Sequence, residues 1–305
     1  MTLTLNPALD VSSSVEAMAH THKLRCTEPI IEPGGGGINV ARVCQQRGVP
    51  ITCVVAAGGP NGLRLTELLS DQGLSVRPIS LAAETRQNLA VHEDSTGEQY
   101  RFVFPGPALS GSELGQCLEQ VALAAESATC VVISGSPPAN GDGGIVARIV
   151  EATPHAKVIV DTVGSALRDA LQSGCYLAKP SARELASLVG RELPTEADIA
   201  SAAEALMATS NLEHLVVSLG AGGVFAVSTD GTRHRVRAPA VDVRSAIGAG
   251  DAMVAGLAIG THEGLPFREC LMLGIAFGTA AVLTPGSQLC EPGDVERLLP
   301  MVMCD

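Results

Sequence analysis

The segment Ala246-Ile247-Gly248-Ala249-Gly250-Asp251 is a glycine-rich turn that runs directly into Ala252–Ile259, an apolar run of helical length. Gly248 and Gly250 carry no Cβ, so the backbone N–H groups of this turn can approach an anion closely. The helix that follows directs its own unpaired N–H groups and a partial positive charge at the same place. The segment therefore predicts an anion-binding helix N-terminus.

Asp251 lies in the first turn of this helix. An acidic residue there can simply favour the start of a helix. A carboxylate beside a phosphate-binding turn can also take a proton from a hydroxyl group, while the N–H groups hold the charge that develops on a transferred phosphoryl group. The rest of the chain decides between these two interpretations.

Composition limits the class of protein and of ligand. Of 305 residues, 46% are hydrophobic and 17% are charged, which is typical of a folded α/β protein. The absence of Trp, with two Tyr and five Phe, argues against base stacking on nucleic acid. A net charge of -12 disfavours nucleic acid and anionic membranes as partners, so any phosphate site needs a local positive field.

The cysteine pattern and the hydropathy suggest a reducing, aqueous compartment. The nine cysteines form no C-x-x-C pair, so neither disulfides nor a zinc site are expected. No leader peptide and no apolar run of transmembrane length is evident, and we expect a cytoplasmic protein.

Strands and helices alternate along most of the chain, beginning with a strand expected over Leu3–Leu9. This alternation predicts a parallel sheet covered by helices on both faces. Two segments interrupt it: residues 11–31 are polar and β-prone, and residues 85–106 contain a predicted β-hairpin. We expect one main domain over residues 1–305, with a small β-sheet lid formed by the segments near 11–31 and 85–106.

A second glycine-rich segment, Gly34–Gly37, runs directly into the amphipathic segment Ile38–Arg47. A flexible linker would not continue into a helix, so this turn is expected to face a ligand. Lys and Arg total only 20, and four of them fall in the two interruptions, where they would gather over Gly34–Gly37: Lys23, Arg25, Arg86 and Arg101. Because arginine binds phosphate bidentately, this arrangement predicts a phosphorylated substrate.

A family resemblance is carried by Asn6-Pro-Ala-Leu-Asp10 and by the segments at 23–26, 32–42, 85–89, 97–103, 132–136, 217–220 and 248–251. Through them the sequence resembles the ribokinase-like (PfkB-type) carbohydrate kinases over essentially its whole length, most closely the minor bacterial 6-phosphofructokinase branch of that family. It implies a three-layer α/β/α fold with a mainly parallel central sheet and a small β-sheet lid, and a homodimer formed through that lid. It also implies ATP and Mg²⁺, and phosphoryl transfer to the C1 hydroxyl of fructose 6-phosphate.

The resemblance assigns roles position by position. Asp251 would be the catalytic base, and Gly248, Ala249 and Gly250 would form the anion hole. The sugar phosphate would be bound by Asp10, Lys23, Arg25, Gly35, Gly36, Asn39, Arg86, Arg101 and Ser136. The nucleotide would be bound by Lys179, Ser181, Ser218, Gly220, Gly223, Ile275 and Thr279. Glu184 would act on hydrated Mg²⁺, and the family's K⁺-binding positions are Ser245, Ile247, Ala281 and Gly286.

Two departures from the family pattern concern the nucleotide. The Asn-x-x-Glu motif reads Ser181-Ala-Arg-Glu184, and a threonine before the glycine-rich turn is Ala246. We expect weaker nucleotide binding or a lower rate. Two alternatives stay open: a kinase for another phosphosugar, tagatose 6-phosphate or fructose 1-phosphate, and a sugar-phosphate or nucleotide sensor that has lost turnover.

Overall fold

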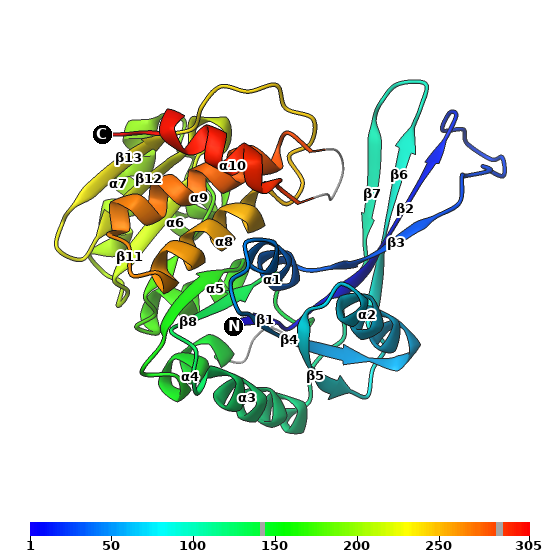
Figure 1. Ribbon diagram of the computed structural model, residues 1–305, viewed down its shortest axis with the longest axis horizontal. Helices are drawn as coiled ribbons and strands as arrows, with labels where there is room; N and C mark the ends of the chain where they lie inside the picture. The colour runs from blue at the N-terminus through cyan, green and yellow to red at the C-terminus, as the bar shows by residue number, and fades with distance from the viewer. Residues whose placement is uncertain (141–143, 285–288) are drawn as a thin grey trace.

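A long sheet lies at the centre of the computed structural model, which describes residues 1–140, 144–284 and 289–305 (Figure 1). Within these ranges it has ten strands in the order β14-β13-β12-β11-β10-β9-β8-β1-β4-β5. The strands from β5 to β11 are parallel, and the last three are antiparallel. Their bounds are β1 Thr2–Thr4, β4 Thr52–Gly58, β5 Ser75–Leu81, β8 Cys130–Ser134, β9 Lys157–Asp161, β10 Leu177–Ala178, β11 His214–Ser218, β12 Val224–Ser228, β13 Arg233–Arg237 and β14 Met303–Cys304.

Helices cover both faces of this sheet, because its inner strands are apolar on both sides. Val54 and Ala56 of β4 pack into one core, and Cys53 and Val55 pack into the core on the other face. One face carries α1 Gly36–Gln46, α2 Gly59–Asp71, α8 Ala249–His262, α9 Phe267–Ala281 and α10 Pro292–Leu298. The other carries α3 Gly111–Ala125, α4 Ile145–Ala152, α5 Gly164–Gln172, α6 Ala182–Val189 and α7 Glu196–Met207. The expected three-layer α/β/α fold is confirmed.

The two interrupting segments pair in a separate sheet that projects from the main body (Figure 1). Its described strands are β2 Ala8–Val15, β3 Ile30–Gly34, β6 Arg86–Glu93 and β7 Gln99–Val103. β2 pairs in parallel with β6 from Ala8↔Arg86 to Val15↔Glu93, and β3 and β7 flank that pair in antiparallel fashion. We call this sheet the lid.

One expected strand is wrong. The segment Leu3–Leu9 is not continuous, because β1 ends at Thr4 and β2 begins at Ala8. Pro7 lies between them, and proline has no N–H to donate to a strand partner. The chain therefore leaves the main sheet here and enters the lid.

The parallel strands β1, β8, β9, β10 and β11 all end at the same edge of the main sheet, where open α/β sheets bind their ligands. The turns before α1 and α6 lie at this edge, as does the turn before α8. In the part of the chain that is described, no helix has the length and apolar character needed to cross a bilayer.

Candidate active site

Helices α1 and α8 begin beside one another. Gly35 precedes α1 and Gly248 precedes α8, with φ of +75° at Gly248, and no side chain from the described residues caps either start. A Cβ on Gly36 would lie 3.2 Å from Oδ1 of Asp251 and would overlap Oγ of Ser134, so only glycine permits this approach. Two helix N-termini with unpaired N–H groups therefore adjoin one carboxylate.

The carboxylate of Asp251 is held by Asn39, in the first turn of α1. Nδ2 of Asn39 donates a hydrogen bond to Oδ2 of Asp251 over 2.8 Å. Burial raises the pKa of Asp251 above its ordinary value, and the Asn39 bond and the positive charge of Lys179 lower it only in part. A carboxylate with a raised pKa is a better proton acceptor than an exposed one, which suits the role expected for Asp251.

A buried ion pair lies next to Asp251. Nζ of Lys179 is 3.0 Å from Oδ1 of Asp161. Burial opposes the charge on Lys179, but Asp161, Glu184 and Asp251 outweigh it and raise the lysine pKa, so the ammonium group stays protonated. Burial also raises the pKa of Asp161 to about 6, against the attraction of Lys179. A fixed positive charge therefore lies among three carboxylates.

Asp161 was not among the residues expected at the site. It is the last residue of β9, and Lys179 directly follows the neighbouring strand β10. Parallel strands end at one edge of a sheet, so the two strand ends were a signal that both residues lie at this edge, but their pairing also requires that the two strands are neighbours.

The Ser181–Glu184 segment forms a capping box at the start of α6. The N–H of Ser181 donates to Oε2 of Glu184 over 2.7 Å, and the N–H of Glu184 donates to Oγ of Ser181 over 3.2 Å. Serine is one of the best N-cap residues. The departure from asparagine therefore keeps the helix start intact and holds the Glu184 carboxylate at the carboxyl edge of the sheet.

Three of the residues expected at the nucleotide, Ser218, Gly220 and Gly223, lie at the end of β11 and in the turn that follows it, beside this capping box. The N–H of Ser218 donates to the Pro180 carbonyl over 2.9 Å, so the segments after β10 and β11 run together. Gly220 opens the 3₁₀ turn η1 Gly220–Gly222, and Gly223 follows it. Ile275 and Thr279 instead lie buried in α9.

The lid faces the turn before α8. A groove of about 310 Å³ is lined by Asp10, Asn88 and Arg101 of the lid and by Ile247 of that turn. Nδ2 of Asn88 donates to Oδ1 of Asp10 over 2.8 Å. Burial raises the pKa of Asp10, against the Asn88 bond and the charges of Arg101 and Arg86. A hydrogen-bonding carboxylate in such a groove can bind the hydroxyl groups of a sugar.

Arg86 and Ser136 meet at the base of the lid. Nη2 of Arg86 lies 3.5 Å from Oγ of Ser136 and donates to the Asn6 carbonyl over 3.1 Å, while Nη1 donates to the Phe104 carbonyl over 3.0 Å. Two of the residues expected at the phosphate end of the substrate are thus together in one chain.

Lys23 and Arg25 lie elsewhere, which corrects one expectation. They are exposed in the connection between β2 and β3, at the free end of the lid (Figure 1). The N–H of Thr27 donates to the Ser14 carbonyl at that end, whereas Arg86 pairs with the first residue of β2 at the base. At ~3.3 Å per strand residue, roughly 20 Å of β2 separates the two ends. The expected gathering of all four cations over the Gly34–Gly37 turn is therefore wrong for a single chain.

The residues expected to bind K⁺ are brought together only in part. The N–H of Ser245 donates to the Val282 carbonyl over 3.3 Å, which holds this turn against the end of α9. The Ala281 carbonyl, however, already accepts from N and Oγ1 of Thr284 over 3.3 and 2.9 Å. Gly286 lies outside the described residues. K⁺ binding by these residues therefore stays a prediction.

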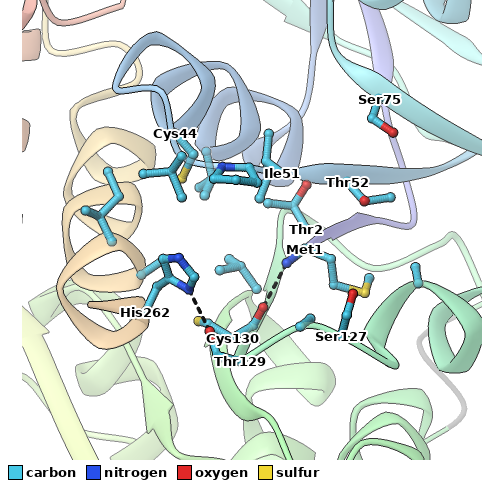
Figure 2. Close-up of a pocket in the computed structure, with 18 residues that line it drawn as sticks. Met1, Thr2, Cys44, Ile51, Thr52, Ser75, Ser127, Thr129, Cys130 and His262 are labelled. Carbon is cyan, nitrogen blue, oxygen red and sulfur yellow. Dashed lines mark hydrogen bonds between the residues drawn. The ribbon is translucent and has the colours of Figure 1, made fainter. Parts of the chain in front are cut away.

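A larger cavity, of about 420 Å³, lies at the opposite, amino-terminal edge of the main sheet (Figure 2). His262 Nδ1 and Thr129 Oγ1 are 2.7 Å apart in its wall. Among the described residues that line it there is no Asp, Glu, Lys or Arg. No carboxylate among those residues could act as the base of phosphoryl transfer, so the carboxyl edge is the better candidate despite its smaller groove.

Comparison with known proteins yields one consistent group. Residues 7–294 match the family described as pfkB family carbohydrate kinase. An ATP-dependent 6-phosphofructokinase isozyme 2 from Mycobacterium tuberculosis is 42% identical over 303 residues, covering 99% of this chain and 89% of that protein. The isozyme 2 of Escherichia coli K12 is 40% identical over 300 residues, covering 97% and 96%. The crystal structure of phosphofructokinase-2 from Escherichia coli in complex with fructose-6-phosphate superposes with a TM-score of 0.90 at 38% identity, covering 98% and 97%.

Proposed function

Because this chain belongs to the pfkB family of carbohydrate kinases, we propose that it transfers the γ-phosphoryl group of ATP to the C1 hydroxyl of fructose 6-phosphate, giving fructose 1,6-bisphosphate. The observation that carries the proposal is the Asp251 carboxylate held by Asn39 at the adjoining N-termini of α1 and α8. The names of the related isozymes support the choice of sugar phosphate.

In the proposed step, Asp251 accepts the proton of the C1 hydroxyl as the C1 oxygen forms a bond to the γ-phosphorus. The bond from that phosphorus to the bridging oxygen breaks, and ADP leaves with the electron pair. The N–H groups of Gly248–Gly250 stabilise the charge on the phosphoryl oxygens. Lys179 adds a fixed positive charge, since its Nζ is 4.0 Å from where a Cβ of Gly250 would lie.

ATP would lie along the carboxyl edge, over the Ser218–Gly223 turn, with its phosphates toward Lys179. Asp161 and Glu184 are the carboxylates that fit Mg²⁺ there. In the described ranges no group of three or more His, Cys, Asp or Glu could hold a metal ion alone, so water and phosphate oxygens would complete its ligands. Bound Mg²⁺ would neutralise charge on the phosphates.

The lid favours a homodimer in which each chain completes the other's site. Ile30, Val103 and Phe104 are large apolar side chains exposed on the lid, and such surfaces commonly bind a partner. If two lids pack together, Lys23 and Arg25 of one chain can reach the groove of its partner. They would then bind the phosphate end of a sugar that Asp10 and Arg86 hold from the other chain.

Mixed dimers test this arrangement. One chain carries Lys23→Ala with Arg25→Ala and keeps Asp251, and the other carries Asp251→Asn and keeps both cations. If the cations act across the dimer, the mixed dimer has one complete site, and activity returns after the two weak variants are mixed and allowed to exchange. If the cations act within their own chain, mixing restores nothing.

A coupled ADP-release assay tests the proposed function. We expect turnover of fructose 6-phosphate by the unmodified protein, and a fall in kcat of at least ~10²-fold in Asp251→Asn, the typical contribution of a positioned base. Near-normal turnover in Asp251→Asn would contradict the role given to Asp251.

A substrate panel decides between the remaining candidates. A higher kcat/KM for tagatose 6-phosphate or fructose 1-phosphate would change the sugar but keep the mechanism. Preference for an unphosphorylated sugar would refute the cationic phosphate site. Tight calorimetric binding of a phosphosugar without ADP release would identify a sensor, for which the departures at Ser181 and Ala246 are the motivation.

A further inference from the structure

Asn6 lies between β1 and β2, where the chain leaves the main sheet for the lid, and only 7% of its surface is exposed. Its Nδ2 donates to the Pro137 carbonyl over 2.9 Å and to Oγ of Ser136 over 3.3 Å. A carbonyl can only accept a hydrogen bond, so this contact fixes which end of the Asn6 amide carries the nitrogen. The amide NH₂ group therefore faces the loop that follows β8.

The other end of the amide meets the opposite side of the lid base. A Cβ on Gly106, just after β7, would overlap Oδ1 of Asn6. Oδ1 is buried and has no hydrogen-bond partner among the described residues. Leaving a buried amide oxygen unpaired is unfavourable, so an asparagine in this position calls for a reason beyond stability.

Arg86, the first residue of β6, contacts the backbone of Asn6. We call Asn6, Arg86, Gly106 and Ser136 the Asn6 cluster. Nη2 of Arg86 donates to the Asn6 carbonyl over 3.1 Å, and its Nη1 donates to the Phe104 carbonyl over 3.0 Å. The chain segments that enter β2, enter β6 and leave β7 therefore meet around the Asn6 side chain and backbone. Movement of the lid relative to the main sheet would disturb these contacts together.

The contact with Ser136 determines what that hydroxyl can do. A serine hydroxyl has one proton and two lone pairs. Oγ of Ser136 accepts from Asn6 and lies 3.5 Å from Nη2 of Arg86, so two donor groups face its oxygen. Its own proton is then directed toward another acceptor. A phosphate dianion offers only acceptors, and it is the group that the proposed function brings to Ser136.

We infer that Asn6 is a positioning residue that holds Ser136 as a hydrogen-bond donor to the phosphate end of the sugar phosphate and couples that contact to the base of the lid. The inference rests on the proposed function, because that function puts the phosphate beside Ser136. Asn6 acts through Ser136, so its loss should weaken ground-state and transition-state binding equally.

Steady-state kinetics of Asn6→Ala test the inference. We expect the KM for fructose 6-phosphate to rise about tenfold, while kcat stays within about twofold and the KM for ATP is unchanged. Asn6→Asp should raise the KM further. The new carboxylate would accept the hydrogen bond of the Ser136 hydroxyl in place of the phosphate, and its negative charge would repel the phosphate. Asn140→Ala is the matched control: Asn140 makes two hydrogen bonds to the Leu109 backbone nearby, and its loss should change neither KM.

A double-variant cycle separates positioning from a structural role. If Asn6 acts through Ser136, the KM of Asn6→Ala with Ser136→Ala equals that of Ser136→Ala alone within about twofold. If the rise in KM of the double variant is instead the product of the rises in the two single variants, the inference is overturned. If Asn6→Ala does not fold, Gly106→Ala displaces the same amide from its other side and should raise the same KM.

The proposed function can fail separately. Suppose that Ser136→Ala raises the KM for fructose 6-phosphate, whereas the single variants Asn6→Ala and Gly106→Ala both leave it unchanged. The kinase assignment then stands and the inference is overturned. If the unmodified protein neither binds nor phosphorylates any sugar phosphate of the panel, both are overturned.

Discussion

Asn39 and Asp251 are 212 residues apart in the chain, and the amide of one donates a 2.8 Å hydrogen bond to the carboxylate of the other. Each lies in the first turn of its helix, α1 or α8. The bond therefore links two helix N-termini from opposite ends of the sequence and fixes the carboxylate between them. It also stabilises the ionised form of a carboxyl group whose pKa burial has raised.

Removing that bond should shift the pH dependence of the reaction. Asn39→Ala removes the hydrogen bond that lowers the pKa of Asp251 and keeps the burial that raises it, so this pKa rises further. A base works only when ionised, so the acid limb of the kcat profile should move to higher pH, with activity at pH 6 falling more than activity at pH 8. Profiles of kcat against pH measure this. The control is Asn88→Ala, which removes the equivalent hydrogen bond to Asp10 and should leave the acid limb of the profile in place. An acid limb that does not move in Asn39→Ala would refute the role given to the Asn39–Asp251 bond.

Gly36→Ala should reduce activity by crowding the base. The new Cβ would overlap Oγ of Ser134 and would lie 3.2 Å from Oδ1 of Asp251, so the Ser134 side chain, the carboxylate or the start of α1 must shift. Displacement of a positioned group is costly, and we expect kcat/KM to fall at least about tenfold. Gly111→Ala is the control, because a Cβ there meets nothing within 4 Å. Equal kinetics in both variants would show that α1 does not position the base.

The layers of this fold were predictable because each depends on the pattern of apolar and polar residues within a short segment. Apolar runs bounded by turns specified the strands, and the two β-prone interruptions specified the lid. The break at Pro7 was missed because the apolar pattern of Leu3–Leu9 continues across a residue that cannot donate a backbone hydrogen bond. The strand β14 is only two residues long and depends on pairing with β13, so no local pattern specifies it.

The proposed site could be inferred from the sequence where one segment carries it and not where several segments must meet. The turn before α8 was found from its own residues. The Asp161–Lys179 pair depends on the order of strands in the sheet, and the separation of Lys23 from Arg86 depends on the length and register of β2. The Asn6 cluster joins three chain segments, and no spacing in the sequence brings them together.

Ser181 offers a test of the proposed nucleotide site, because two effects can be measured separately: its capping of α6 and its contact with bound ATP. Ser181→Ala removes the Oγ that accepts from the Glu184 N–H and should destabilise the protein by about 1 kcal/mol. Ser181→Asn keeps an N-cap acceptor and adds an amide donor, so stability should be retained while the KM for ATP falls severalfold. Thermal unfolding and kinetics measure the two effects. An unchanged KM in Ser181→Asn would mean that residue 181 serves only the helix.

His214 should make the protein acid-sensitive in a defined range. It is buried, stacked on Phe267 with ring centres 3.7 Å apart, and its Nδ1 is 2.8 Å from Oγ of Ser228. Burial, with the charge of Lys157, lowers its pKa to about 4 from an ordinary 6.5. Folding therefore favours the neutral ring: its contribution is fully present above pH 6.5 and is lost as the pH falls toward 4, on the order of 3 kcal/mol in total.

Denaturant unfolding between pH 7.5 and 4.5 measures this contribution. His214→Gln cannot take up the proton, so its free energy of unfolding should decline less over that range than that of the unmodified protein, even if it is lower at pH 7.5. His262→Gln, which changes an exposed histidine on α8, should keep the full decline. Parallel curves for the unmodified protein and His214→Gln would mean that His214 is not the group whose protonation destabilises the fold.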